Sequence, residues 1–205
     1  MILAAIGDID GNARVLEAVL ADIDAAGIQT IVHVGDCVGF GTEPNETVAL
    51  LRARVVPGVQ GDMDRRAARF ARKHARETLR AECAPEVFDA LQRTYDALRS
   101  EHVEYLAGLP RERRLTVDAV AVYLCHGSPN GQDAGLGEDD DPRRFQRFRE
   151  VAQADVIVMG HTRNPFSRLV DGTLFVNPGA VADSPACYAV VDTEAEPWSV
   201  TFRRL

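Results

Sequence analysis

Hydrophobic residues follow two different periods in the first part of the chain. Ile2–Ile6 is an unbroken apolar run of strand length, and residues 30–34 form a second run rich in β-branched side chains. Residues 12–26 instead carry apolar side chains three and four positions apart, which predicts an amphipathic helix. A second helix is predicted over residues 44–54, and a short third strand over residues 55–59. This alternation of strands and helices predicts a parallel sheet covered by helices.

The rest of the chain predicts first a mainly helical stretch and then a series of short strands with one further helix. Residues 64 to about 82 predict one helix, and Pro85 begins another whose apolar face extends to His102. A further helix begins at Asp141 and Pro142, which provide an N-cap and a proline in the first turn. Short strands are expected at residues 115–117, 120–125, 156–159, 166–169, 174–176, 188–191 and 199–202. We therefore expect an α/β fold in a single domain over residues 1–205, a sandwich of mixed sheets with helices outside and a helical insertion around residues 64–107.

The composition is that of a globular protein, since 46% of the 205 residues are hydrophobic and 26% are charged. Lysine and arginine number 23 against 31 aspartates and glutamates, and the net charge of −8 argues against an extensive nucleic-acid surface. No apolar run approaches the roughly 20 residues that span a bilayer, and the first residues lack a basic leader, so we expect a cytoplasmic protein with no membrane partner. The cysteines form no C-x-x-C pair, which predicts reduced, buried thiols at Cys37, Cys83, Cys125 and Cys187.

Acidic residues and histidines follow the predicted strands at the points where the strands end. They are Asp8 and Asp10 after the first strand, Asp36 after the second, Asp62 after the third, and His126 and His161 after two later strands. Each lies beside a glycine, which lets the backbone come close and adopt tight turns. A single aspartate here is ordinarily a turn or cap residue, but the carboxyl ends of strands in an open α/β sheet face one crevice. Carboxylates crowded into one crevice repel unless a cation holds them, so the pattern predicts a metal site.

In chain order these residues read as D-x-D, G-D, G-D-x-D, an isolated H-G and G-H-x-R. The series resembles the calcineurin-like metallophosphoesterases, in which the corresponding motifs are D-x-H, G-D, G-N-x-D, H-G and G-H-x-H. The resemblance is closest to the small prokaryotic branch described as phosphodiesterase-like or diadenosine-tetraphosphatase-like. Further stretches that fit this branch are Gly35-Asp36-Cys37-Val38-Gly39-Phe40-Gly41 with Pro44-Asn45-Glu46, Gly160-His161-Thr162, and Asn177-Pro178-Gly179-Ala180.

The resemblance covers nearly the whole chain. It implies a four-layer α/β/β/α sandwich of two mixed sheets flanked by helices, built around a two-metal site. The ligands that it implies are Asp8 for one metal, Asp36 as a bridge to both, and Asp62, His126 and His161 for the second. Ligands of this type suit Mn²⁺ or Mg²⁺ at the first site and Mn²⁺, Fe or Zn²⁺ at the second, with Mn²⁺ the best overall match.

Several positions depart from the family pattern. Asp10 and Arg163 stand where the family has histidine, and Asp62 stands where it has asparagine. A carboxylate at Asp10 can still bind a metal, whereas the guanidinium of Arg163 cannot, and it is free to pair with Asp8 or Asp10. We therefore expect one tightly held ion at the second site and a weaker or empty first site, so that one or two ions are bound. Met63 stands where relatives with a G-N-H-D motif have a histidine able to protonate a leaving group.

The resulting hypothesis is a metal-dependent hydrolase of a small phosphodiester, phosphomonoester or nucleotide phosphoanhydride. Asp36 and His126 form the catalytic centre with the metal, and Asn12 and Arg163 contact the phosphate. Arg65 and Arg66 begin a basic stretch that receives distal phosphates, unless this stretch is simply a solvated helix face.

Two alternatives stay open. The first is a degenerate relative that binds a phosphorylated ligand or a partner without turnover, because Asp10 and Arg163 alter the same metal site. The second is a haloacid-dehalogenase-like phosphatase, whose first motif resembles Asp8-Ile9-Asp10-Gly11. That family offers no role for His126 or His161, and Asn12 stands where it has Thr or Val, which disfavours it.

Overall fold

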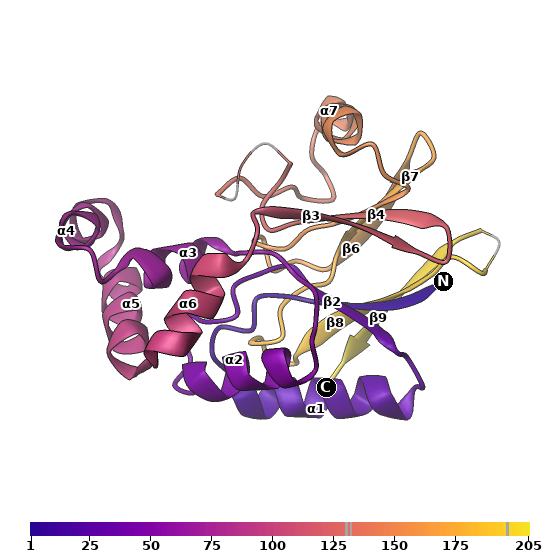
Figure 1. Cartoon of the computed structure of the whole chain (residues 1–205). Helices are drawn as coiled ribbons and strands as arrows, with labels where there is room; N and C mark the ends of the chain where they lie inside the picture. The colour runs from indigo at the N-terminus through magenta and orange to yellow at the C-terminus, as the bar shows by residue number, and fades with distance from the viewer. Residues whose placement is uncertain (130, 132, 196) are drawn as a thin grey trace.

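Two β-sheets pack face to face in the computed structural model, which describes residues 1–129, 131, 133–195 and 197–205 (Figure 1). The first sheet has the order β2-β1-β8-β9 and consists of β1 (Ile2–Ile6), β2 (Thr30–His33), β8 (Cys187–Asp192) and β9 (Ser199–Arg204). The second has the order β3-β4-β5-β7-β6 and consists of β3 (Glu112–Val117), β4 (Val120–Cys125), β5 (Val156–Val158), β6 (Phe166–Val170) and β7 (Thr173–Asn177). Both sheets are mixed. In the first, β1 pairs parallel with β2 and antiparallel with β8. In the second, β5 is parallel to β4 and β7, and the edge strands β3 and β6 pair antiparallel with β4 and β7.

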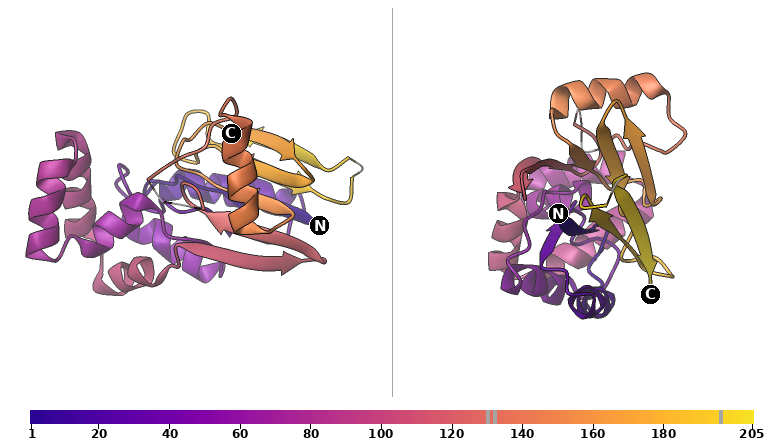
Figure 2. Two further views of the ribbon diagram at one scale, coloured as in Figure 1. Left: turned by 90° about the horizontal axis from the view of Figure 1, so that it is seen from above. Right: turned by 90° about the vertical axis from the view of Figure 1, so that its right-hand side faces the viewer.

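Helices cover the outer faces of both sheets. Helices α1 (Ala13–Ala25) and α2 (Pro44–Ala53) pack on the first sheet, and α7 (Pro142–Ala152) packs on the second (Figures 1 and 2). Residues of β1 alternate between the two interfaces: Leu3 and Ala5 face the other sheet, and Ala4 and Ile6 face the helices. The four-layer α/β/β/α arrangement is therefore confirmed.

The remaining helices form a helical cap that projects from one side of the sandwich (Figure 2). The cap consists of α3 (Asp62–Arg69), α4 (Lys73–Glu82), α5 (Pro85–Ala97) and α6 (Ser100–Gly108). Its interior is aromatic, since the ring of the fully buried Phe70 lies 5.4 Å from that of Phe88 and 5.5 Å from that of Tyr95. In the described part of the chain, no helix is long and apolar enough to cross a membrane. All four cysteines are free thiols.

Two expected helices are each divided in the structure. The helix expected over residues 64–82 begins earlier, at Asp62, and is broken between α3 and α4, where the ring of Phe70 turns into the cap interior. The helix expected from Pro85 to His102 ends at Ala97, because the next free backbone N–H, that of Arg99, donates to Asn45 Oδ1 at 2.9 Å. In both places a contact distant in sequence outweighs local helix propensity.

The strand expected over residues 55–59 is not formed. Only a single bridge joins His33 to Gly58 at the edge of β2. Val55 has a left-handed backbone (φ 51°) in the turn after α2, and Pro57 has no N–H to donate to a ladder. The chain nevertheless stays against β2, because the His33 N–H donates to Pro57 O at 3.0 Å.

This bridge gives a stability prediction. A Cβ on Gly58 would lie 2.1 Å from two ring atoms of the fully buried His33, whereas one on Gly108 would meet nothing within 4 Å. We expect Gly58→Ala to lower the free energy of unfolding by about 1–3 kcal/mol through overpacking. The control Gly108→Ala should change it by less than about 1 kcal/mol. Urea denaturation measures both, and equal stabilities would contradict the close approach of Gly58 to His33.

Candidate metal centre

Five side chains, four of which follow strands, come together at one end of the two sheets. Asp8 follows β1, Asp36 follows β2, and Asp62 is the first residue of α3. His126 comes directly after β4, and His161 lies in the loop after β5. The three aspartates are each at most 6% exposed, and His126 is fully buried. Parallel strand ends therefore gather these groups in the interior, as expected for an open α/β sheet.

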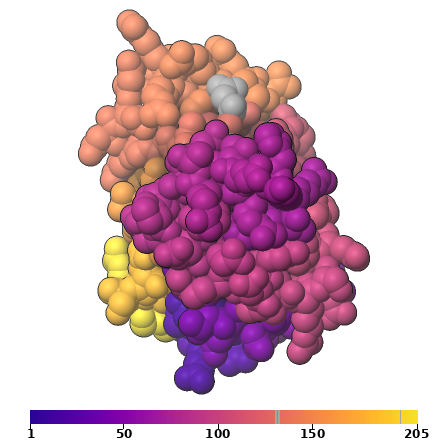
Figure 3. Space-filling model, turned by 90° about the vertical axis from the view of Figure 1, so that its left-hand side faces the viewer, coloured from indigo at the N-terminus to yellow at the C-terminus, as the bar shows by residue number. Residues whose placement is uncertain are grey.

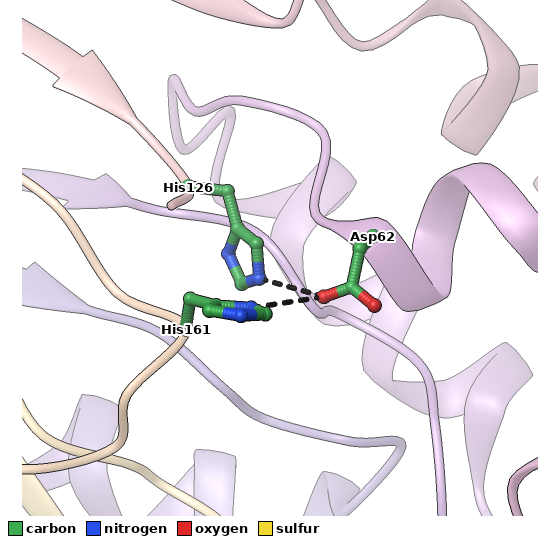
Figure 4. A group of neighbouring side chains, drawn as sticks. All are labelled: Asp62, His126 and His161. Atoms are coloured by element: carbon green, nitrogen blue, oxygen red, sulfur yellow. Dashed lines mark hydrogen bonds and ion pairs between the residues drawn. The ribbon is translucent and has the colours of Figure 1, made fainter. Parts of the chain in front are cut away.

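Asp62 and the two histidines converge on a common point (Figure 4). Asp62 Oδ1 lies 3.1 Å from His126 Nε2 and 3.2 Å from His161 Nδ1. The two imidazole rings meet edge to face, with their centroids 5.2 Å apart. One carboxylate oxygen and two ring nitrogens directed at each other form a donor set that suits Mn²⁺, Fe or Zn²⁺.

A second group of ligand atoms shares His126 with the first. It consists of Asp8, Asp36 and His126, whose ligand atoms all lie within 4.8 Å of one another. His126 Nε2 lies 3.4 Å from Asp36 Oδ2, so Asp36 adjoins both groups. His126 Nδ1 contacts the carbonyl oxygen of Val34 at 2.7 Å, which assigns the N–H to Nδ1 and turns Nε2 toward the carboxylates. Metal-binding histidines are commonly oriented in this way, so the residues fit a divalent cation.

The backbone is held in an unusual conformation at these ligands. Asp8, Asp36 and His161 have left-handed φ angles of 49°, 50° and 67°. Residues other than glycine adopt this region at an energetic cost, which the surrounding hydrogen bonds must offset. Asp36 Oδ1, for example, accepts the Met63 N–H at 2.9 Å. Gly61 allows this approach, because a Cβ there would lie 2.1 Å from the same oxygen.

The electrostatics of the centre show the cost of its burial. Burial, together with the charge of Asp36, raises the pKa of Asp8 to about 7. Burial alone would lower the pKa of His126, but Asp36 and Asp62 hold it well above its ordinary value. The hydrogen bond to Asp62 likewise raises the pKa of His161. Burial opposes ionisation of Asp62, yet the two histidines and Arg66 hold its pKa below the ordinary value. Without another cation, the centre therefore retains protons near neutral pH.

Asp10 and Arg163 form a separate unit beside these groups. Arg163 donates to Asp10 Oδ2 and to Asp183 Oδ1, each at 2.6 Å. Burial raises the pKa of Asp10 to about 6, and Arg163 limits this rise. In the described part of the chain, Asp10 belongs to neither ligand group. With Asn12 and the half-exposed Phe40, the pair lines an open cavity of about 420 Å³.

The two arginines of α3 lie on the cap side of the centre. Arg66 forms an ion pair with Asp62 and a second, at 3.4 Å, with Asp133. Arg65 contacts both carboxylate oxygens of Asp133, at 2.8 and 2.9 Å. The basic stretch is thus connected to the ligand groups through Arg66.

Comparison with known proteins agrees with this geometry. A model of the calcineurin-like phosphoesterase superfamily domain matches residues 1–196. The chain belongs to the calcineurin-like phosphoesterase superfamily. The family and fold expected from the sequence motifs are confirmed. Members of this superfamily generally bind divalent metals, and the structure contains candidate ligand groups for them.

Individual relatives of this calcineurin-like phosphoesterase cover most of its length. Protein MJ0912 of Methanocaldococcus jannaschii is 28% identical over 188 residues, which cover 87% of this chain and 69% of that protein. A metallophosphoesterase from Sphaerobacter thermophilus, known from its crystal structure, has a TM-score of 0.73 and 27% identity, covering 100% of this chain and 88% of that one. Hypothetical protein PH1004 from Pyrococcus horikoshii has a TM-score of 0.89, and the match covers 100% of this chain and 87% of that one. Its 22% identity limits this last likeness to the fold.

Sequence reasoning missed two residues that support this candidate centre. Asp64 is fully buried, accepts the N–H groups of Gly61 and Val38, and has a pKa raised to about 7 by burial and by the charge of Asp36. Its signal was the spacing G-x-x-D. Asn177 donates to Gly160 O and to Thr162 Oγ1, at 3.0 and 2.9 Å, and so supports the His161 loop. The motif Asn177-Pro178-Gly179 was visible, but it indicated no role.

The pKa shifts predict how the metal-free protein responds to pH. The folded-state values of Asp8 and Asp10, about 7 and about 6, exceed the ordinary 3.8, so the native state holds more protons than the unfolded state between pH 4 and 7. The raised pKa values of His126 and His161 act in the same direction. Stability should therefore fall as the pH rises from 5 to 8, whereas the contribution of Asp62 is lost only below about pH 4.

Thermal unfolding at pH 5 and pH 8, with and without Mn²⁺, measures this effect. We expect the Tm of the metal-free protein to be several degrees lower at pH 8, and Mn²⁺ to reduce the difference because a cation replaces the protons. Asp8→Asn should flatten the metal-free profile, whereas the exposed control Asp139→Asn should not. A metal-free Tm that rises between these pH values would contradict the prediction.

Proposed function

We propose that this calcineurin-like phosphoesterase hydrolyses a small phosphodiester, phosphomonoester or nucleotide phosphoanhydride with the help of a bound divalent metal. The observation that carries the proposal is the convergence of Asp62, His126 and His161 on one point beside Asp8 and Asp36. Superfamily membership supports phosphoester chemistry in general, and the choice of substrate and the catalytic competence are part of the proposal.

Each residue of the centre has a role in this proposal. Asp36, Asp62, His126 and His161 would hold the more tightly bound ion, and Asp8, with Asp36 and Asp10, would hold any second one. The ion, for which Mn²⁺ is the best match, would polarise a phosphoryl oxygen and lower the pKa of a bound water toward ~7. The Val34 carbonyl keeps His126 Nε2 directed at the ligand cluster, which supports its role as a ligand.

Asn12 and Arg163 are proposed to bind the phosphate. Both line the open cavity next to the ligand groups, and Arg163 has donors in a planar arrangement that matches phosphate oxygens. Asp10 and Asp183 hold the guanidinium from two sides, so it is oriented before a substrate arrives. A positioned donor of this kind neutralises charge that develops on the phosphoryl group.

A hydrolysis screen tests the proposal. Protein stripped of metal and refilled with Mn²⁺ is assayed with bis(p-nitrophenyl) phosphate, p-nitrophenyl phosphate and dinucleoside polyphosphates. Turnover that requires Mn²⁺ and is abolished by His126→Ala supports the enzyme. The ion pair between Arg163 and Asp10 favours a second candidate, a relative that binds a phosphorylated ligand or partner without turnover. No turnover above the metal-only blank would establish that candidate instead.

The Arg163–Asp10 pair predicts unequal metal affinities. A bidentate-capable guanidinium competes directly with a metal for Asp10, so Mn²⁺ titrated into metal-free protein should bind with two unequal affinities or as one equivalent. His161→Ala should weaken the tighter site, because His161 belongs only to the Asp62 group. Replacing both Asp10 and Arg163 by histidine should strengthen the weaker site. Isothermal titration calorimetry measures these affinities, and two equally tight equivalents in the unchanged protein would refute the prediction.

Met63 predicts a preference for good leaving groups. It follows Asp62 in the chain, is 5% exposed, and its thioether has no proton to donate to a departing alkoxide. General acid help is worth ~10²–10⁴ in rate, so kcat/KM for p-nitrophenyl phosphate should exceed that for glycerol phosphate by about this factor. Met63→His should narrow the gap, and Met63→Leu should leave it unchanged. Similar kcat/KM values for the two substrates in the unchanged protein would show that another group supplies the proton.

A further inference from the structure

The helical cap encloses a basic cavity that the proposed reaction does not yet use. This cap cavity, of about 620 Å³, lies between α3 and α4 and is lined by Arg65, Arg66, Arg69 and Arg72, with Glu82 and Asp133 as its acidic residues and Leu79 among its apolar ones. Figure 3 faces the cap, with its magenta surface in the centre and the orange segment that follows β4 above it. Four arginines around one hollow are unexpected in a protein whose net charge is −8. Such a concentration of positive charge favours an anionic ligand.

Two of these arginines have no acidic partner among the described residues. In the part of the chain that the structure describes, neither Arg69 nor Arg72 forms an ion pair, and both side chains are exposed. Arg65 and Arg66 instead share the carboxylate of Asp133, which reaches them from the loop after β4. Asp133 thus provides an anion from the protein's own chain, bound by the two arginines of the cap cavity that lie nearest Asp62 in the sequence.

The Asp133 contacts are of a kind that a stronger anion displaces. The Asp133 side chain is 53% exposed, and an ion pair this open to water contributes little to stability. A phosphate carries more charge and more acceptor oxygens than a carboxylate and binds guanidinium groups with paired hydrogen bonds. Arg65 and Asp133 also line a second cavity, of about 510 Å³, so displacement of Asp133 would open one cavity to the other.

The cap cavity adjoins the candidate metal centre. One guanidinium, that of Arg66, contacts both Asp62 of the ligand group and Asp133 of the cap cavity. A phosphate bound at the centre and a second phosphate bound by Arg65 and Arg66 would therefore be neighbours in one chain. Arg69, one turn further along α3, continues the row into the cap.

We propose that the cap cavity binds the second and further phosphates of a polyphosphate. The Asp133 carboxylate occupies Arg65 and Arg66 until one of these phosphates displaces it. The substrate class is then a compound with at least two linked phosphates, whether a nucleoside polyphosphate or an inorganic one. The proposal rests on the proposed function for the identity of the reacting phosphate, but the anion subsite exists without it.

In the metal-free protein no metal holds a phosphate at the centre, and Arg69→Gln separates the subsite from the phosphate contacts proposed for Asn12 and Arg163. In the presence of EDTA, calorimetry is used to compare inorganic tripolyphosphate, ATP and orthophosphate. We expect tripolyphosphate and ATP to bind at least about tenfold more tightly than orthophosphate, since several charge-assisted hydrogen bonds replace one. Arg69→Gln should lower the affinity for tripolyphosphate about threefold or more. Asp133→Asn should raise this affinity by a similar factor, because the substitution removes the competing carboxylate. Arg147→Gln, an exposed control on α7, should leave the affinities for tripolyphosphate and ATP unchanged.

The outcomes separate this inference from the proposed function. Equal affinities for tripolyphosphate and orthophosphate, or an Arg69→Gln effect no larger than that of Arg147→Gln, would overturn the subsite even in an active enzyme. If ATP bound and tripolyphosphate did not, the proposed subsite would also be overturned, because the protein would then recognise the nucleoside and not the phosphate chain. Tight tripolyphosphate binding by a protein with no Mn²⁺-dependent turnover would support the subsite and reject the hydrolase.

Discussion

Asp8, Asp36 and Asp62 lie buried around the imidazole of His126, and like charges at such separations repel strongly where water is excluded. The arrangement is maintained by the surrounding backbone and not by mutual attraction of the carboxylates. Asp8 and Asp36 adopt left-handed turns, and the absence of a Cβ at Gly61 leaves room for Asp36 Oδ1. Much of the fold can be understood as the scaffold that keeps these charges together.

Each carboxylate that departs from the family pattern has its own arginine. Asp62, which stands in place of an asparagine, pairs with Arg66, and Asp10, which stands in place of a histidine, pairs with Arg163. The two departures therefore follow one physical rule: an added negative charge is matched by a cation within hydrogen-bonding distance. Their consequences differ, because Asp62 still faces the two histidines, whereas Asp10 is hydrogen-bonded to Arg163, which also binds Asp183.

Apart from the strand expected over residues 55–59, which is not formed, the strands and the gathering of charged residues at their ends were predictable, because an apolar run followed by a glycine and an acid is typical of a buried strand that ends at a site. The breaks between α3 and α4 and between α5 and α6 were not, since they depend on the burial of Phe70 and on Asn45, which lies 54 residues before Arg99. Asp133 and Asp183 escaped notice for a related reason. Exposed acids in loops carry no local signal, and only the folded chain brings them to their arginines.

Helix α3 carries the candidate metal ligand Asp62 at its first position and the arginines of the cap cavity on its following turns. A short helix moves as one rigid unit, so a shift of the cap that repositions Arg66 also repositions Asp62. Two ligands that each favour a particular setting of this helix become thermodynamically coupled, and such coupling is reciprocal. An anion that draws the cap inward would change the affinity of the centre for its cation by the same factor as the cation changes the affinity for the anion. Bound metal would then change the affinity for the substrate, and bound substrate the affinity for the metal, through the single helical turn between Asp62 and Arg66.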